Sequence, residues 1–504
     1  MKRSIALAAS ALALAAPATV QPHSGLGLSL LAQVGTVDER FLSYNVEMVE
    51  VTGGRFWAPY GGPPGEMYRM RPPENLADPK LRGLARYIGP SYMRVSGTWA
   101  NFTYLEADGE KLEKPPEGYE QILTRDQWRG VIDFARAADA KLGVSYAVST
   151  GPRGPDGAWK TDQAQRLHDL TTQSGGEIAW SEFINEPNAA SMGHLPQGYS
   201  TEDYTRDLRI FREWAAKSAP GMTIVGPGGV GEGALDGDIP VAMPKGMLRT
   251  EELMKASPNS VDVVSYHFYG GVSQRCKNVG AGQADKAAAL TWPWLDLSIR
   301  DWRYYARLRD KYEPGDPMWV TETAQAACGG SPWGSTFLDT FRYLNQLGLY
   351  AQKGVKAVFH NTLAASDYAL IDQESRVPRP NYWAAVLWRR TMGTTVLASP
   401  ASPSTDMRLY AHCLPGRRGG VGVLAINTGM PALSLAFDKG ATSWTMMASP
   451  LDSGSVSVNG KTPSLDAQGM LTGLEGAPVN GSVAVPGQSI VFVTVPGANN
   501  RVCR

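Results

Sequence analysis

The sequence predicts an α/β fold, a (β/α)8 TIM barrel with a C-terminal β-sandwich domain. Between about residues 40 and 365, short β-rich runs alternate with amphipathic helical segments, the pattern of βα units around a parallel sheet. After about residue 390, short strands alternate with Gly, Pro, Ser and Asn turns, which is typical of a sandwich. The length of 504 residues suits one large and one small domain.

Eight strand candidates make up the barrel. In chain order they are FLSYNVEMVEV (41–51), SYMRVSG (91–97), KLGVSYAVST (141–150), IAWSEFINEP (178–187), MTIVGPGG (222–229), VDVVSYHFYG (261–270), PMWVTETA (317–324) and VKAVFHNTL (355–363). Segments 124–140, 200–219 and 335–354 between them carry apolar residues at three- and four-residue spacing, with Ser or Thr near their starts. Eight such units match a TIM barrel.

The N-terminus has the pattern of a secretory signal peptide. Lys2 and Arg3 precede an apolar run to about Ala16, and Ala16-Pro17-Ala18 provides a small-residue cleavage site. We therefore expect residues 1–18 to be removed and the mature protein to be secreted or periplasmic. Residues 19–39 can add a strand to the sandwich, the barrel takes residues 40–390, and the sandwich takes residues 391–504.

Charge and cysteine usage exclude several classes of function. Lys plus Arg and Asp plus Glu both number 48, so no overall field draws the chain to nucleic acid or a membrane. The cysteines contain no CxxC spacing, which disfavours a zinc site. In an oxidising compartment an even number favours disulfides. We expect Cys276 to pair with Cys328, and Cys413 with Cys503, the alternative being buried free thiols.

Two acids stand at the carboxyl ends of predicted barrel strands, where TIM barrels carry their chemistry. Glu186 follows strand four, directly before Pro187, and Glu322 lies at the end of strand seven. Closing the barrel brings these strand ends into one pocket. Two carboxylates flanking a scissile bond are what glycoside hydrolysis needs, because one protonates the leaving oxygen and the other attacks the anomeric carbon or activates water.

Several stretches resemble glycoside hydrolase family 79 of clan A, the β-glucuronidases and heparanases. They include FLSYNVE, RVSGT, SYHFYG, WVTETAQAACGGSPWGSTFLDTFRYLNQLGL, DYALID, NYWAAVLWRRTMGTTVL and LYAHC, and the similarity runs from about residue 40 to the C-terminus. The resemblance implies a retaining double displacement in which Glu186 is the acid/base and Glu322 is the nucleophile.

The resemblance also implies substrate-binding residues. Asn185 matches the asparagine that binds the sugar 2-hydroxyl, and Tyr269 matches the tyrosine that orients the nucleophile. Glu47, at the end of strand one, matches an acid that binds sugar hydroxyls. His267 shares the facing of Tyr269 and is a candidate contact for substrate or for Glu322. Glu182, four residues before Glu186 and on the same side of the strand, would lie deeper in the barrel and is expected to be structural.

A glucuronide carries a carboxylate, and in the family a Gly-rich loop after strand seven and a tyrosine after strand eight bind it. Here Gly329, Gly330 and Tyr368 match those positions, whereas Ala327 and Cys328 depart from the family pattern. A Cys276–Cys328 disulfide would tie the loops after strands six and seven together. Arg275 and Lys277, in the first of these loops, could meet further acidic or sulfated sugars, but we expect them to be isolated surface bases.

The sequence therefore predicts a glycoside hydrolase that acts on an oligo- or polysaccharide containing uronic acid. Nothing in it calls for a cofactor or a metal, and a monomer is expected. Two alternatives remain open at this stage. One is a clan A glycosidase of another sugar, a β-xylosidase or arabinofuranosidase, and the other is a non-catalytic carbohydrate-binding barrel.

Overall fold

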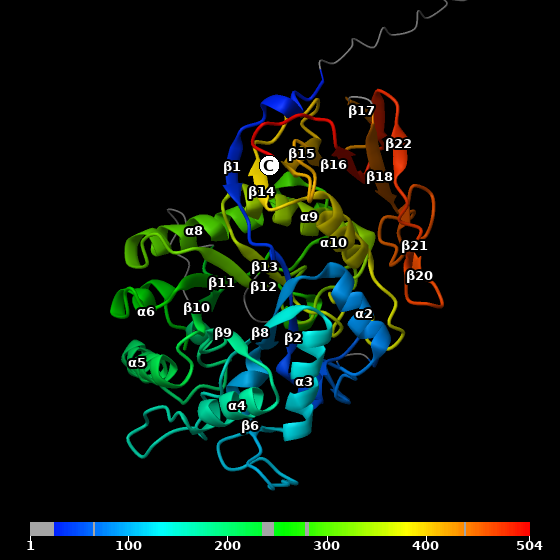
Figure 1. Cartoon of the computed structure of the whole chain (residues 1–504). Coiled ribbons are helices and arrows are strands. Elements are labelled where there is room, and N and C mark those ends of the chain that lie inside the picture. Colours follow the sequence, from blue (N-terminus) through cyan, green and yellow to red (C-terminus); the bar gives the residue numbers. More distant parts are fainter. Residues whose placement is uncertain (1–24, 64–65, 234–245, 278–281, 438–439) are drawn as a thin grey trace, which may run out of the picture.

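The computed structural model describes residues 25–63, 66–233, 246–277, 282–437 and 440–504, so the predicted signal peptide lies outside it. Eight parallel strands close into a barrel, which confirms the predicted fold class (Figure 1). They are β2 (Leu42–Glu47), β5 (Ser91–Ser96), β8 (Ala140–Val144), β9 (Ile178–Glu182), β10 (Thr223–Val230), β11 (Val263–Tyr269), β12 (Met318–Ala324) and β13 (Ala357–His360).

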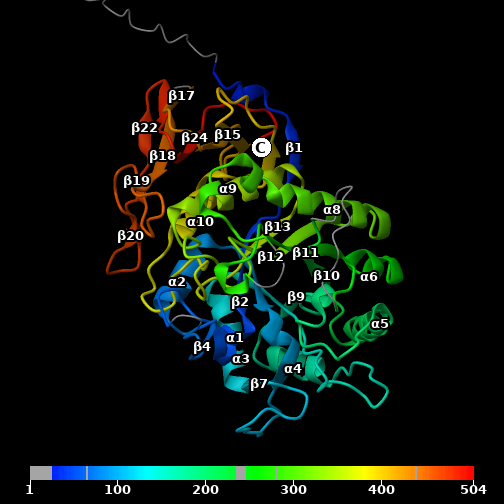
Figure 2. The same cartoon turned by 180° about the vertical axis from the view of Figure 1, so that it is seen from behind.

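Helices connect the strands and cover the barrel. They are α1 (Met48–Thr52), α2 (Pro79–Ile88), α3 (Arg125–Ala137), α4 (Asp162–Gln173), α5 (Thr201–Ser218), α6 (Thr250–Ala256), α7 (Trp292–Leu295), α8 (Leu297–Tyr312), α9 (Phe337–Gln352) and α10 (Pro380–Thr391). Thr124 and Ser200 begin α3 and α5 with reciprocal side-chain to backbone hydrogen bonds, as their positions in the sequence predict. Figure 2 shows α9 and α10 lying between the barrel strands and the second sheet.

Short strand pairs and short 3-10 helices lie between the longer elements. Two short strand pairs are β3 (Gly54–Trp57) with β4 (Tyr68–Arg71), which is antiparallel, and β6 (Thr103–Leu105) with β7 (Gln121–Leu123), which is parallel. The short 3-10 helices are η1 (Leu28–Leu30), η2 (Thr98–Phe102), η3 (Pro187–Ala189), η5 (Gln274–Cys276) and η6 (Lys286–Ala288). None of the helices in the described ranges is long and apolar enough to cross a membrane.

The barrel interior is apolar at one end and charged at the other. Near the amino ends of the strands, Trp180, Trp319 and Phe359 form an aromatic cluster with neighbouring Tyr92. Side chains alternate along a strand, so the residue two positions further on points into the same interior. On β9 this places Glu182 above Trp180. The aromatic layer closes the bottom of the barrel and leaves the carboxyl ends of the strands for polar groups.

The second sheet is antiparallel and has two apolar faces. Its strand order is β1-β14-β15-β16-β24-β18-β19, with β22 beside β18. Along β16, Val423 packs in one cluster with the smaller sheet β17–β23, whereas Leu424 packs in the cluster of the barrel helices. On β24, Val491 and Phe492 divide in the same way. The sheet therefore shares a core with the barrel.

The remaining strands form the second sheet, the small β17–β23 layer and a separate β20–β21 pair. The strands are β1 (Gln33–Thr36), β14 (Thr395–Leu397), β15 (Met407–Cys413), β16 (Val421–Asn427), β17 (Leu433–Ala436), β18 (Ala441–Met447), β19 (Ser457–Val458), β20 (Ser464–Leu465), β21 (Leu471–Thr472), β22 (Ala477–Val479), β23 (Ser482–Val485) and β24 (Ser489–Val495). Strand β1, from the N-terminal segment, pairs with β14 at one edge.

Candidate active site

The site is built on a buried arginine that the sequence places in the middle of β5. Arg94 has a fully buried side chain, and its guanidinium donates to Glu182 Oε2 at 2.6 and 2.9 Å and to Glu322 Oε2 at 2.9 Å. It also donates to Asn185 Oδ1 at 2.8 Å. Charges taken out of water must be paired and hydrogen-bonded, and this cation joins two anions from β9 and β12.

Glu182 is part of the foundation of the site. Besides Arg94, its carboxylate accepts hydrogen bonds from Ser265 Oγ at 2.6 Å and from Thr321 Oγ1 at 2.7 Å. No exposed surface remains on it. Burial raises the pKa of this carboxyl, but Arg94 and His267 more than offset burial and hold it well below its ordinary value. The predicted structural position of Glu182, deeper than Glu186, agrees with this arrangement.

A β-bulge turns Glu322 into the barrel. In the pairing of β11 with β12, Tyr266 lies opposite Val320 and His267 opposite Glu322, so Thr321 is an extra residue. A bulge of this kind re-aims the side chains beside it. Thr321 and Glu322 both reach the interior as a result. Glu322 then accepts a hydrogen bond from the Tyr269 hydroxyl at 2.6 Å, and its side chain stays 9% exposed.

Glu186 lies beyond the end of β9 in a left-handed backbone conformation, with φ 51° and ψ 58°. A non-glycine residue in this region carries strain that its surroundings must hold. Asn101 does so on one side, since its amide pairs with both the N–H and the C=O of Asn185. Asn188 pairs in the same way with the N–H and C=O of Val230 on β10. Two asparagines thus hold the turn that carries Glu186.

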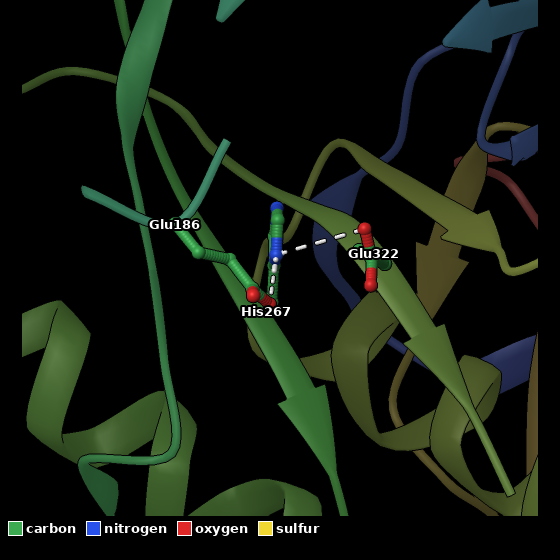
Figure 3. Close-up of side chains that lie close together, drawn as sticks. All are labelled: Glu186, His267 and Glu322. Atoms are coloured by element: carbon green, nitrogen blue, oxygen red, sulfur yellow. Dashed lines mark hydrogen bonds and ion pairs between the residues drawn. The ribbon is translucent and has the colours of Figure 1, made fainter. Parts of the chain in front are cut away.

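His267 lies between the glutamates (Figure 3). Its Nδ1 is 3.0 Å from Glu186 Oε1 and 3.8 Å from Glu322 Oε2, while its Nε2 is 3.3 Å from Glu182 Oε2. One ligand-type atom from each of Glu186, His267 and Glu322 lies within 4.8 Å of the others. The His267 side chain has no exposed surface, whereas that of Glu186 is 19% exposed, so the glutamate is the group that an incoming molecule reaches.

The charges in the site balance when Glu186 holds a proton. Burial raises the pKa of Glu186, and the negative charge of Glu322 adds to this, against the opposing hydrogen bond from His267. Burial lowers the pKa of His267, but Glu322 and Glu182 reverse the effect and raise it to about 10. Two cations, Arg94 and His267, therefore face the anions Glu182 and Glu322, and a third buried anion would be unpaired.

Glu47 and Tyr368 meet through a residue that the sequence reasoning missed. Asn361, directly after β13, donates from Nδ2 to Glu47 Oε1 at 3.1 Å and contacts the hydroxyls of Tyr269 and Tyr368 at 3.0 Å each. Burial and the charge of Glu322 raise the pKa of Glu47 to about 8. Its Oε2 is buried against the backbone of Gly97 and has no hydrogen-bond partner among the described residues.

The loop after β12 contains Gly329 and Gly330, and both predicted disulfides form. The Cys276–Cys328 bond joins the loops after β11 and β12, and the Cys413–Cys503 bond joins the end of β15 to the segment after β24. Arg275 is a correction to the sequence prediction. Its side chain is only 5% exposed and is paired with Asp367, whereas Lys277 is exposed as expected. Arg275 lies next to the disulfide-bonded Cys276 and packs inward against Asp367, a partner 92 residues away that the local sequence does not indicate.

The carboxylates and imidazole of the cluster are also ligand types for a cation. Their spacing would suit one, but Arg94, Tyr269 and His267 already occupy the same oxygens as donors. The arrangement is therefore suited to acid–base and nucleophilic chemistry. Arg94, like Asn361, was missed by the sequence reasoning, although a charged residue in the apolar run SYMRVSG was a signal for it.

This chain is similar in sequence to several glucuronide-cleaving enzymes. No family model matches the sequence. Heparanase of Mus musculus is 26% identical over 67% of this chain and 68% of its own length. Heparanase-like protein 1 of Arabidopsis thaliana is 30% identical over 70% and 64%, respectively. Hyaluronoglucuronidase of Hirudo nipponia is 22% identical over 85% and 92%.

Among solved structures, the same fold occurs in a 4-O-α-L-rhamnosyl-β-D-glucuronidase from Fusarium oxysporum. The two chains superpose with a TM-score of 0.62 at 12% identity, covering 92% of this chain and 97% of the other. At this identity the likeness concerns the fold alone. It shows that a closed barrel joined to an antiparallel sheet is an architecture found among glycosidases.

Proposed function

We propose that this chain, which belongs to the heparanase-like glycoside hydrolase family 79, hydrolyses β-linked glucuronic acid residues by a retaining double displacement. The observation that carries the mechanism is the approach of Glu186 and Glu322, whose nearest oxygens lie within 4.8 Å. Retaining enzymes have carboxyl groups ~5–5.5 Å apart, whereas inverting enzymes separate them by ~6.5–9.5 Å to admit a water. The short spacing supports direct attack by a carboxylate.

In the first step, Glu322 attacks the anomeric carbon and forms a glycosyl ester while the glycosidic C–O bond breaks. Glu186 gives its proton to the leaving oxygen, so the aglycone departs as an alcohol. In the second step, Glu186, now ionised, takes a proton from water. The water oxygen bonds to the anomeric carbon, the ester breaks, and Glu322 is restored with the sugar configuration retained.

The surrounding groups fit these roles. Arg94 and Tyr269 each donate to Glu322, which orients the nucleophile. Before the reaction, the charge of Glu322 helps to keep Glu186 protonated. Esterification removes that charge, so the pKa of Glu186 falls at the moment when it must act as a base. His267 positions Glu186 through the 3.0 Å contact, and Asn185 is assigned to the sugar 2-hydroxyl.

The glucuronate carboxylate is assigned to the loop after β12 and to Tyr368. The relatives named heparanase and hyaluronoglucuronidase support a polysaccharide substrate that contains glucuronic acid. The backbone N–H groups of Cys328 and Gly329 donate to no acceptor among the described residues. Successive free amides in a left-handed turn form a concave anion site. Glu47 and Asn361 are assigned to ring hydroxyls beside it.

Export is part of the proposal. The expected signal peptide and the two disulfides both support an oxidising compartment, outside the cell or in the periplasm. The chain is proposed to act there as a monomer.

The test of substrate class compares purified enzyme on 4-nitrophenyl β-glucuronide, β-xyloside and α-L-arabinofuranoside. We expect the highest kcat/KM on the glucuronide, with the first-formed sugar in the β configuration by NMR. Higher kcat/KM on the xyloside or arabinofuranoside would reject the uronate assignment. Product sizes from heparan sulfate or hyaluronan then separate terminal trimming, which yields monosaccharide alone, from internal cleavage, which yields oligosaccharides.

A further inference from the structure

We propose that Arg275 and the Cys276–Cys328 disulfide form a clamp that sets the preference of this enzyme for an anionic sugar. The clamp holds Cys328, Gly329 and Gly330 in the one conformation that keeps two neighbouring backbone amides free to bind a carboxylate. The inference rests on the proposed function, and it adds residues that contact no substrate themselves. Arg275 and the disulfide are positioning residues that act through the loop.

The loop has an unusual backbone. Cys328, Gly329 and Gly330 have φ values of 64°, 77° and 83°, so three consecutive residues are left-handed. Glycine adopts this region readily, but a residue with a Cβ does so at a cost of roughly 1–2 kcal/mol. Cys328 therefore stands where glycine would be favoured, and it needs an outside restraint. The bond to Cys276 supplies one at that residue.

All three carbonyl groups of the loop are held from outside. The C=O of Cys328 accepts from Ser273 Oγ at 2.9 Å and from Arg275 Nη1 at 3.3 Å. The C=O of Gly330 accepts from Arg275 Nη1 at 2.8 Å, and the C=O of Gly329 accepts from the Asp367 N–H at 3.1 Å. In a trans peptide the N–H points opposite to the C=O. The Gly329 N–H is thus turned away from Ser273 and Arg275.

The neighbouring amides are already used, which leaves a defined pair. The N–H of Ala327 donates to Gly271 O, that of Gly330 to Ala326 O, and that of Ser331 to Gln325 Oε1. Only the N–H groups of Cys328 and Gly329 within this run lack an acceptor among the described residues. Successive amides of this kind attract anions.

Arg275 joins the loop to two other segments, the one after β3 and the one after β13. Its guanidinium donates to Ala58 O in the segment after β3 and forms an ion pair with Asp367 after β13. The guanidinium also lies 3.8 Å from the centroid of the Tyr60 ring. With the side chain 5% exposed and its donors occupied, it has no free donor for substrate. Its effect on specificity must therefore pass through the loop.

The glycines fit closely against aromatic side chains of the site. A Cβ on Gly329 would lie 2.8 Å from Cβ of Trp57, and a Cβ on Gly330 would lie 3.1 Å from Cβ of Tyr368. The Tyr368 hydroxyl contacts Asn361, which contacts Glu47. The loop therefore packs directly on Tyr368, one of the residues assigned to the sugar. A small shift of the loop backbone would move the two free amides relative to the bound sugar.

The test compares kcat/KM for 4-nitrophenyl β-glucuronide with kcat/KM for the matched β-glucoside, which has the same ring without the carboxylate. In Cys276→Ala/Cys328→Ala, the strained residue loses its restraint, and we expect the glucuronide-to-glucoside ratio to fall roughly 10- to 100-fold, the range for a hydrogen bond to a charged group. Most of the change should be in KM for the glucuronide. Cys276→Ala/Cys328→Gly should recover part of the ratio, because glycine tolerates the left-handed region without the bond.

Arg275→Lys provides an independent arm that keeps both cysteines. A lysine keeps the positive charge but cannot bridge several carbonyls, so the ratio should again fall. If the double-alanine variant does not fold, the ratios of Arg275→Lys and of Cys276→Ala/Cys328→Gly test the clamp instead. The control is Cys413→Ala/Cys503→Ala, which removes the other disulfide and should leave the ratio at the wild-type value.

The outcomes separate the clamp from the proposed function. A wild-type enzyme without preference for the glucuronide would overturn the proposed function itself. A wild-type preference that persists unchanged in Cys276→Ala/Cys328→Ala and in Arg275→Lys would overturn the clamp alone. Equal losses on glucuronide and glucoside would also overturn it, since they would indicate general damage to the site. A fall in the ratio with partial recovery by the glycine variant supports it.

Discussion

The mouth of the barrel and the antiparallel sheet bury their residues in opposite ways. At the mouth, Arg94, Glu182 and Glu322 lie in one buried ionic network. In the sheet, strands such as β16 and β24 bury Val423, Phe492 and similar side chains on both faces. Buried ion pairs seldom improve stability over apolar packing of the same volume. The sheet therefore supports the fold, while the mouth is organised for chemistry.

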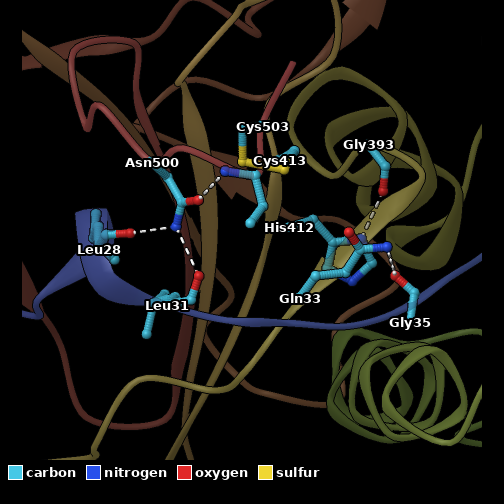
Figure 4. Close-up of a disulfide and its surroundings, with 10 residues drawn as sticks. Leu28, Leu31, Gln33, Gly35, Gly393, His412, Cys413, Asn500 and Cys503 are labelled. Atoms are coloured by element: carbon cyan, nitrogen blue, oxygen red, sulfur yellow. Dashed lines mark hydrogen bonds between the residues drawn. A yellow bond between two sulfur atoms is a disulfide. The ribbon is translucent and has the colours of Figure 1, made fainter.

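The two disulfides follow the same division. Cys276–Cys328 ties two loops at the mouth, next to the proposed carboxylate site, whereas Cys413–Cys503 joins β15 to the last residues of the chain (Figure 4). The covalent chemistry is identical, so any difference in their effect on activity must come from location. This makes the pair a natural comparison for experiment.

The largest expected effect separates chemistry from packing. Glu322→Gln removes the nucleophile and should abolish turnover of 4-nitrophenyl β-glucuronide, with sugar binding retained by calorimetry. Phe492→Ala in the sheet should leave kcat unchanged and lower the free energy of unfolding by about 3–5 kcal/mol. Turnover by Glu322→Gln at a wild-type rate would reject the mechanism.

Arg94→Met tests how much the buried ionic network depends on its cation. Removing the cation leaves Glu182 and Glu322 buried without it, so we expect about 3–5 kcal/mol lower unfolding free energy in urea, together with loss of activity. The control Arg209→Met breaks the exposed Arg209–Glu213 pair on α5, in which both side chains are more than half exposed. That change should stay within ~0.5 kcal/mol. Similar losses in both variants would contradict the distinction drawn between buried and exposed pairs.

The disulfide pair should give nearly equal losses of stability. In the chain-entropy account, a bond contributes according to the logarithm of its loop length, so separations of 52 and 90 residues differ by only about 0.5 kcal/mol. Each double-alanine variant should lose roughly 4 kcal/mol in denaturant unfolding. Stability alone would then leave the two indistinguishable, and a large inequality would show strain or local structure unique to one region.

The smallest expected effect is a shift in pH dependence. His267 has a pKa of about 10 against its ordinary 6.5, so its contribution to stability is complete below pH 6.5 and is lost as pH rises towards 10. Between pH 6.5 and 10, the free energy of unfolding of His267→Gln should therefore fall less than that of the wild-type protein. The variant also loses an interaction that lowers the pKa of Glu186, so the alkaline limb of kcat/KM should move to higher pH.

Glu47, whose pKa is about 8, titrates in the same range in both proteins, so the difference between the two profiles reports the change at His267. Identical unfolding profiles would mean that His267 is not charged in the folded protein. An alkaline limb that moves to lower pH would contradict the assignment of the proton on Glu186.

Much of the barrel could be predicted, because the spacing of apolar residues indicates the strands and helices, and the order of the strands indicates where their carboxyl ends lie. The eight apolar runs correspond to the eight strands, and the positions of Glu186 and Glu322 after strand four and within strand seven follow from strand order. The bulge at Thr321 could not be predicted, since strict alternation would turn Glu322 away from the side to which Thr321 points. Likewise, pairings across distant segments, such as Asn361 with Glu47 or Arg275 with Asp367, have no local sequence signal.

The N-terminal segment has a consequence for maturation. Asn500 donates from Nδ2 to Leu28 O at 2.7 Å and to Leu31 O at 2.9 Å, and strand β1 then covers the edge of β14 (Figure 4). Proteolytic trimming that stops before Leu28 leaves these contacts intact. Trimming beyond Thr36 would strip the edge strand and leave a buried amide without acceptors, exposing a template for pairing with another chain. Residues 28–36 are therefore the part of the N-terminal segment that has to remain if the chain is trimmed as the proposed export requires.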